Sequence, residues 1–260
     1  MWVKIRVTTT DLQALLDEQY HRFNRPDFIT DDPISLPHRF TKLQDVEIIG
    51  FWVSMLAWGQ RKSIIKSGER LIEYMDGAPH DFIVNHSERD RQRFEAFKHR
   101  TFQPVDALYF LEYLQRYYRQ HDSLEAAFAA HLSPDSEHVG SALVGFHEQF
   151  FDHPYAPQRT RKHVATPARK SACKRLNMYL RWMVRRCEHG VDFGLWRRIL
   201  PSQLLMPLDV HVERTAKHLG LLHRKPTDWQ AVLELTDALR QLDPDDPVKY
   251  DFALFGMGVG

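Results

Sequence analysis

Apolar residues recur at helical spacing along most of the chain, and no segment shows the alternating pattern of a convincing β-strand. Near the start, Thr10 and Gln13 form a capping-box pattern ahead of an amphipathic segment. Residues 45–58 are apolar almost all round, which predicts a central buried helix. After an interruption at Gly59-Gln60, residues 61–75 continue as an amphipathic helix.

The other periodic segments predict a further series of helices separated by loops. These helices are expected at residues 104–118, 125–131, 140–151, 169–186, 192–199, 209–220, 227–242 and 247–257. The loops are expected at residues 24–42, 154–167 and 201–207, which contain most of the prolines between helices. The sequence therefore predicts an all-α fold of about twelve helices.

Basic residues are concentrated in one part of the chain. The 35 lysines and arginines nearly balance the 34 acidic residues, so the net charge of +1 does not itself indicate a nucleic-acid partner. Between His153 and Cys187, however, there is no acidic residue, and ten lysines and arginines accumulate. This segment could hold phosphates, although a solvated helix face with a basic loop would have the same composition.

The sequence indicates neither a membrane segment nor a bound cofactor. Residues 1–13 lack the apolar core of a signal peptide, and no stretch approaches a membrane-spanning length. Two cysteines favour a reducing setting, so we expect a cytoplasmic protein. His211 and Glu213 point in different directions on a helix, so with His218 they are not expected to hold a metal. No nucleotide-binding glycine loop is present, so no cofactor is expected.

Asp209 and Lys170 are the candidate catalytic residues. Asp209 opens a short helix, where an aspartate ordinarily serves as N-cap. The same position keeps a carboxylate ionised, so that it could stabilise a developing cation. Lys170 is predicted to lie in the first turn of a helix, where Arg169 and Lys174 carry like charges that favour a free, nucleophilic amine. Lys174, one turn further on, is a rival for that role, and an exposed lysine without a role is the ordinary alternative.

These residues lie in motifs that resemble the helix-hairpin-helix DNA glycosylase superfamily, the endonuclease III-like enzymes. RKSA at 169–172 and LDVHVERTAKHLGLL at 208–222 are similar to its lysine and aspartate motifs. The resemblance implies that Lys170 is the nucleophile and Asp209 the catalytic carboxylate. SMLAWGQRKS resembles the region in which a glutamine enters the gap left by a flipped base, which assigns that role to Gln60.

The resemblance is closer in motif spacing to the archaeal 8-oxoguanine glycosylases than to endonuclease III. Two features differ from the superfamily: Thr166-Pro167-Ala168 replaces the glycines of the hairpin, and the four-cysteine iron–sulfur loop is absent. The strings ACKRLNMYLRWMVR and DPVKYDFALFGMGVG also resemble an uncharacterised bacterial family.

The resemblance implies a two-lobed, all-α protein of the helix-hairpin-helix glycosylase type with a cleft between its lobes. We expect residues 43–187 to form a central lobe and residues 1–42 plus 188–260 to form the second. The expected function is a DNA repair glycosylase, with lyase activity as a further step, that acts as a monomer on a damaged base flipped out of double-stranded DNA. The residues expected to contact DNA are Gln60, Arg61, Lys62, Arg161, Lys162, Arg169, Lys174, Arg181 and Arg185.

Two other classes of function stay open on the sequence alone. The first is a non-catalytic nucleic-acid-binding protein on the same scaffold, whose binding would survive loss of Lys170 and Asp209. The second is a structural or interaction protein with no nucleic-acid role. The aromatic residues Trp58, Phe252 and Phe255 are candidates for lining a base pocket, but ordinary core packing is the simpler interpretation of them.

Overall fold

The computed structural model describes residues 9–133 and 135–259, and within these residues every regular element is a helix. This confirms the predicted all-α class. The longer helices are α1 (Thr9–Phe23), α3 (Leu43–Leu56), α4 (Arg61–Tyr74), α7 (Pro104–Tyr118), α9 (Gly140–Phe150), α10 (Lys174–Val184), α11 (Val210–His218), α12 (Trp229–Arg240) and α13 (Asp251–Val259). Shorter ones are α2 (Asp27–Thr30), α5 (Pro79–Asn85), α6 (Glu88–Arg91) and α8 (Glu125–Ala129).

Short 3-10 turns join these helices. They are η1 (Pro33–Ser35), η2 (Pro37–Arg39), η3 (Gln92–Ala96), η4 (Gln158–Lys162), η5 (Pro167–Arg169), η6 (Pro201–Gln203) and η7 (Pro247–Tyr250). Five of the seven begin at a proline, whose fixed φ suits the first position of a helical turn.

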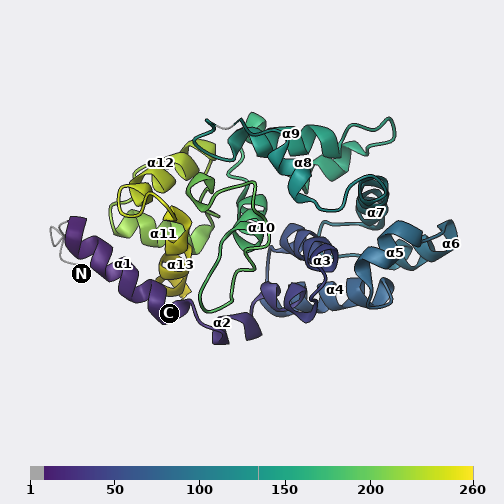
Figure 1. Ribbon diagram of the computed structural model, residues 1–260, viewed down its shortest axis with the longest axis horizontal. Coiled ribbons are helices and arrows are strands. Elements are labelled where there is room, and N and C mark those ends of the chain that lie inside the picture. The colour runs from purple at the N-terminus through teal and green to yellow at the C-terminus, as the bar shows by residue number, and fades with distance from the viewer. Residues whose placement is uncertain (1–8, 134, 260) are drawn as a thin grey trace.

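The two ends of the chain meet at one end of the molecule. Helix α1 packs along α13, and α13 packs against α11, so the first and last helices lie side by side (Figure 1). An added Cβ at Gly256 would lie 2.2 Å from Cδ2 of Phe23, so the close approach of α13 to α1 requires glycine there. Helices α3 to α7 occupy the opposite end, and α10 lies in the middle against α3 (Figure 1).

Helix α3 is the buried centre that its composition predicts. Its eleven residues from Val46 to Leu56 are all buried. The one acidic side chain among them, Glu47, accepts hydrogen bonds from Tyr118, Ser123, the Leu124 amide and the indole of Trp196. Four donors therefore compensate a carboxylate that is 0% exposed, and they tie α3 to three other segments.

Several element predictions differ from the structure. Residues 24–42 are not a plain loop, because they hold α2, η1 and η2, and the helices α5 and α6 were not predicted. The predicted helix at 192–199 is wrong: Gly194 has a positive φ, and the amides of Phe193 and Trp196 donate to carbonyls at the end of α10 instead. The helix predicted from residue 169 begins only at Lys174.

The division into lobes at residues 42/43 and 187/188 stays a prediction, and residues 1–8, 134 and 260 of those ranges lie outside the described residues. No helix in the described part of the chain combines the length and the apolar character needed to cross a membrane.

Candidate active site

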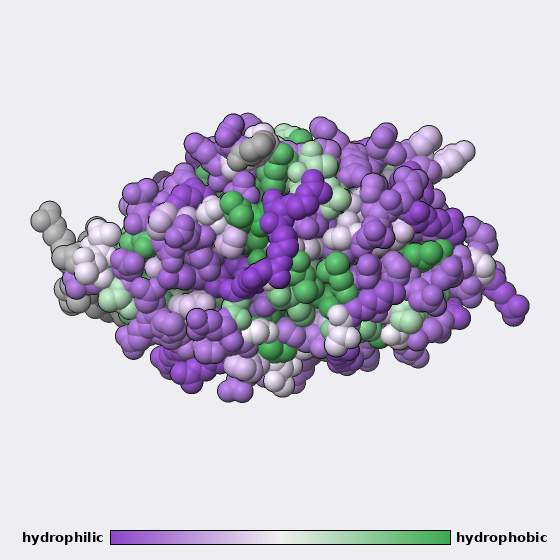
Figure 2. All heavy atoms as spheres, viewed as in Figure 1, coloured by the Kyte–Doolittle hydropathy of each residue, from purple (hydrophilic) through white to green (hydrophobic). Residues whose placement is uncertain are grey.

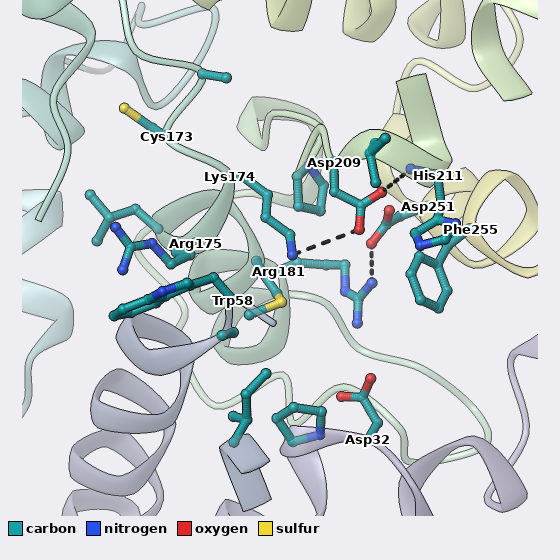
Figure 3. A pocket seen from close by; sticks show the side chains of 18 of the residues that line it. Asp32, Trp58, Cys173, Lys174, Arg175, Arg181, Asp209, His211, Asp251 and Phe255 are labelled. Carbon is teal, nitrogen blue, oxygen red and sulfur yellow. Dashed lines mark hydrogen bonds and ion pairs between the residues drawn. The ribbon is translucent and has the colours of Figure 1, made fainter. Parts of the chain in front are cut away.

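The amine of Lys174 and the carboxylate of Asp209 face each other in a cavity of about 660 Å³. The Nζ atom of Lys174 lies 3.7 Å from Oδ2 of Asp209, and the side chains are 32% and 16% exposed (Figure 3). Both groups are thus partly shielded from water and still open to a ligand. A cavity of this volume is within the usual size range of small-ligand sites.

Lys174 reaches the cavity because α10 begins at this residue. Lys170 and Cys173 both have positive φ values, 60° and 48°, so the backbone cannot be helical between them. The same segment is fixed from outside, since Ser171 bridges to Asp228 and the Trp229 amide donates to the Lys170 carbonyl. The Lys170 side chain is exposed and does not line the cavity.

Asp209 uses its two carboxylate oxygens differently. Oδ1 accepts the amides of His211 and Val212 at 2.8 and 2.9 Å and so caps α11. Oδ2 is the atom that faces Lys174 (Figure 3). The two functions considered for Asp209 from the sequence are therefore compatible: the cap fixes the side chain, and the second oxygen points at the amine.

Two further carboxyl groups enter the same cavity. Asp251, at the start of α13, pairs with Arg181 and is 6% exposed. Burial raises its pKa to about 6; Arg181 opposes this rise, and the nearby Asp209 adds to it. Asp32 lies across the cavity, where its Oδ1 caps η1 (Figure 3). Burial raises the pKa of Asp32 as well, although Arg61 and Lys174 lower it.

Arg181 and Arg185 belong to a buried chain of ion pairs rather than to the surface. Arg181 binds Asp192 as well as Asp251, and Arg185 binds Asp192 and Asp246. The two arginines are 4% and 1% exposed, and Arg181 also lines the cavity. The sequence predicts that both contact DNA, whereas this burial argues against contact with phosphates on the outer surface. Arg181 positions Asp251, and the two arginines together join the C-terminal part of α10 to the following segments.

Aromatic rings form the walls of the cavity. Phe28 packs edge-on against Phe252 and Phe255 at centroid distances of 5.3 and 6.4 Å. On the other side of the cavity, the ring of Trp58, two residues after the end of α3, stacks on the His163 ring at a centroid distance of 5.7 Å. Phe252 belongs to the core, with 1% exposure, and it also lines the cavity. Core packing and a place in the cavity wall are therefore compatible for this residue.

The remaining predicted DNA contacts are divided between surface and cavity. Arg61 lines the cavity, with its guanidinium over the Phe255 ring at 5.1 Å, and its neighbours Gln60 and Lys62 are exposed. Lys162 and Arg169 are also exposed. Arg161 is partly buried, with its guanidinium 4.7 Å from the Phe151 ring. One face of the molecule is mainly hydrophilic, with apolar side chains gathered near its centre (Figure 2).

His211, Glu213 and His218 do not form a metal site. His211 Nδ1 lies 3.1 Å from the Gly258 carbonyl oxygen, and Glu213 binds Lys217 and Thr227. Among the described residues, no group of three or more histidine, cysteine or acidic side chains is arranged to hold a metal ion.

Sequence reasoning missed Asp32, Asp251 and Arg175 as cavity residues. Asp32 precedes Pro33 in an acidic loop, a pattern that indicates a cap but gives no direction to the side chain. Asp251 had a usable signal, because it is the last charged residue and directly precedes the apolar run FALFGMGVG. Arg175 was one of many basic residues in its segment and had no distinguishing pattern.

Comparison with known proteins gives one match. Residues 32–260 match the family model described as "Protein of unknown function (DUF2400)". No curated protein matches the chain. No solved structure matches it either.

Proposed function

This chain belongs to the DUF2400 family, whose members are described only as proteins of unknown function, and we propose that it is a DNA glycosylase with lyase activity. The observation that carries the proposal is the amine–carboxylate pair of Lys174 and Asp209 inside a large cavity. The proposal assigns the nucleophile to Lys174 rather than to Lys170, because only Lys174 lines the cavity.

The pair can perform the chemistry with its own atoms. In its neutral form, the Lys174 amine attacks C1′ of the nucleotide with its lone pair. The bond from C1′ to the base breaks, and the base leaves with the electron pair of that broken bond. The Asp209 carboxylate stabilises the positive charge that develops on the sugar and then accepts a proton from the attached amine. Asp209 passes this proton to O4′ as the C1′–O4′ bond breaks, and the nitrogen lone pair forms the C1′=N bond of a protonated Schiff base. A water molecule then accepts the C2′ proton, the C2′=C3′ double bond forms, and the 3′ phosphate leaves with the electron pair of the C3′–O bond.

The surroundings of the pair suit a flipped nucleotide. The aromatic side chains of Phe255 and Trp58 line the cavity that contains the pair, and its volume of about 660 Å³ admits a nucleobase. Exposed cations at Lys62, Lys162 and Arg169 would bind backbone phosphates without reading sequence. We infer a fold of the helix-hairpin-helix glycosylase type, because a lysine at the start of one helix meets the N-cap aspartate of a later helix. The proposal takes the protein to act as a monomer.

The test is borohydride trapping on duplex DNA that contains an abasic site. Borohydride reduces a Schiff base to a stable amine, and an abasic substrate requires no assumption about the lesion. We expect a covalent adduct with the wild type, none with Lys174→Gln, and a strongly reduced yield with Asp209→Asn. Lys170→Gln is the matched control, since that lysine is four residues away and outside the cavity.

Other outcomes would change the proposal in defined ways. An adduct lost only in Lys170→Gln would return the nucleophile to the position that the sequence motif indicates. Equal adducts in all variants, or none in the wild type, would exclude a Schiff-base mechanism at this site. Salt-dependent DNA binding without an adduct would then favour the non-catalytic binding protein, and no binding would favour a protein without a nucleic-acid role.

A further inference from the structure

The guanidinium of Arg175 is a partly buried cation without an acidic partner. It lies in the second position of α10, next to Lys174, but it points the other way, over the indole ring of Trp58 at 4.8 Å (Figure 3). No carboxylate in residues 9–133 or 135–259 forms an ion pair with it. Burial lowers its pKa to about 10, which still leaves it a cation at neutral pH.

Main-chain carbonyl oxygens accept hydrogen bonds from only some of the N–H donors of the Arg175 guanidinium. Arg175 donates one hydrogen bond to the Met55 carbonyl and one to the Lys162 carbonyl. A guanidinium has five N–H donors, so several donors stay unused. The Trp58 ring and the two carbonyl dipoles offset part of the positive charge, but no anionic group balances it. Buried charges in proteins are normally paired, and an unpaired one is unfavourable unless a ligand supplies the counter-charge.

A second, smaller cavity of about 280 Å³ lies beside this guanidinium. It is lined by Trp58, Thr101, Lys162, His163 and Arg175, and none of these described residues is acidic. His163 lies 3.2 Å from the buried Asp106, but Arg159 already pairs with that carboxylate. The lining thus combines two cations, a hydroxyl group and an imidazole around one small space.

We propose that Arg175, with Lys162 and Thr101, forms a phosphate-binding subsite that holds a backbone phosphate next to the nucleotide in the larger cavity. A planar guanidinium suits two phosphate oxygens at once, and a lysine supplies a second charge. Trp58, His163 and Arg175 line both cavities, so a group bound in one lies directly beside the other. The nucleic-acid part of this inference rests on the proposed function, whereas the anion site itself does not.

The anion site is tested without DNA, by thermal unfolding of the whole protein in inorganic phosphate against sodium chloride of equal ionic strength. We expect phosphate to raise the midpoint of the wild type and to have much less effect on Arg175→Gln and Lys162→Gln. Arg119→Gln is the matched control, because Arg119 also donates to a main-chain carbonyl, that of Val84, but does not line either cavity. Equal stabilisation of all four proteins would overturn the site. Lys162 is exposed, so its variant keeps the test valid if Arg175→Gln does not fold.

A second experiment tests whether the subsite holds a phosphate of the DNA backbone. It uses duplexes that contain an abasic analogue and one neutral methylphosphonate linkage, which is placed in turn at each position near the abasic analogue. We expect one linkage at which neutralisation weakens wild-type binding about tenfold or more, and at which Arg175→Gln shows no further loss. If every linkage affects the two proteins equally, the subsite does not hold backbone phosphate, while DNA binding itself supports the proposed function. If phosphate stabilises the protein but no duplex binds, the anion site stands and both the backbone assignment and the proposed function fail.

Discussion

One oxygen of Asp209 caps α11, and the other lies 3.7 Å from the amine of Lys174 at the first position of α10. A single side chain thereby fixes the start of one helix and faces the start of another. Because the cap uses only Oδ1, the carboxylate can change partner at Oδ2 without loss of the helix start. The structural role of Asp209, the helix cap, thus belongs to Oδ1, and its proposed chemical role belongs to Oδ2. Substitutions of Asp209 can test the two roles separately.

Asp209→Asn should keep the helix cap and remove the charge, so we expect near-normal stability with loss of covalent trapping. Asp209→Ala should lose both, with a destabilisation of about 1 kcal/mol. The measurements are urea denaturation and borohydride trapping on the same preparations. Asp228→Ala is the control for loss of a cap away from the amine, because Asp228 caps α12 through the Ala231 amide and also pairs with Arg224. This variant should lose stability and keep covalent trapping. If Asp209→Asn is as unstable as Asp209→Ala, the cap and the charge cannot be separated.

The stability of the protein should fall as the pH rises from about 4 to about 6, in part because of Asp251. Burial raises the pKa of this group from 3.8 to about 6, so between these values the folded state holds a proton that the unfolded state has lost. The effect is on the order of 2 kcal/mol across that window. Denaturation of wild type and Asp251→Asn at several pH values isolates this contribution. The same pH slope in both proteins would show that Asp251 titrates normally.

Much of the helical architecture could be predicted from the sequence, because periodicity reports the faces that helices bury. The helix at 104–118 and the buried helix before Trp58 are examples. The site residues were harder to predict, since their positions depend on where a helix begins. In a continuous helix, Lys170 and Lys174 would lie one turn apart on the same face. The left-handed backbone at Lys170 and Cys173 breaks the helix, and only Lys174 lines the cavity.

The burial of Arg181 and Arg185 could not be predicted from their neighbours in sequence. Arg181 lies on α10 and Arg185 directly follows it, in a basic segment that was expected to face DNA. Their acidic partners come from later segments of the chain. Long-range pairing of this kind leaves no local pattern. The same limit applies to Asp32, which is separated from Asp209 by most of the chain.

Glu47→Ala should destabilise the protein strongly. The substitution leaves the donors of Tyr118, Ser123 and Trp196 without an acceptor in the centre of the molecule. We expect a loss of roughly 3 kcal/mol or more in the free energy of unfolding, measured by denaturant titration. Glu69→Ala removes an exposed ion pair with Arg39 and should cost less than about 1 kcal/mol. Similar losses for the two variants would mean that Glu47 is not the acceptor that joins these segments.

The salt dependence of DNA binding should show which exposed cations contact phosphate. Each phosphate contact that is lost should lower the slope of log K against log salt by about one. We expect that change for Lys62→Gln and for Arg169→Gln, whose side chains are exposed, measured by fluorescence anisotropy on a duplex with an abasic analogue. Arg22→Gln, on the exposed side of α1, should leave the slope unchanged. A slope that is the same in all three variants would place the DNA on a different surface.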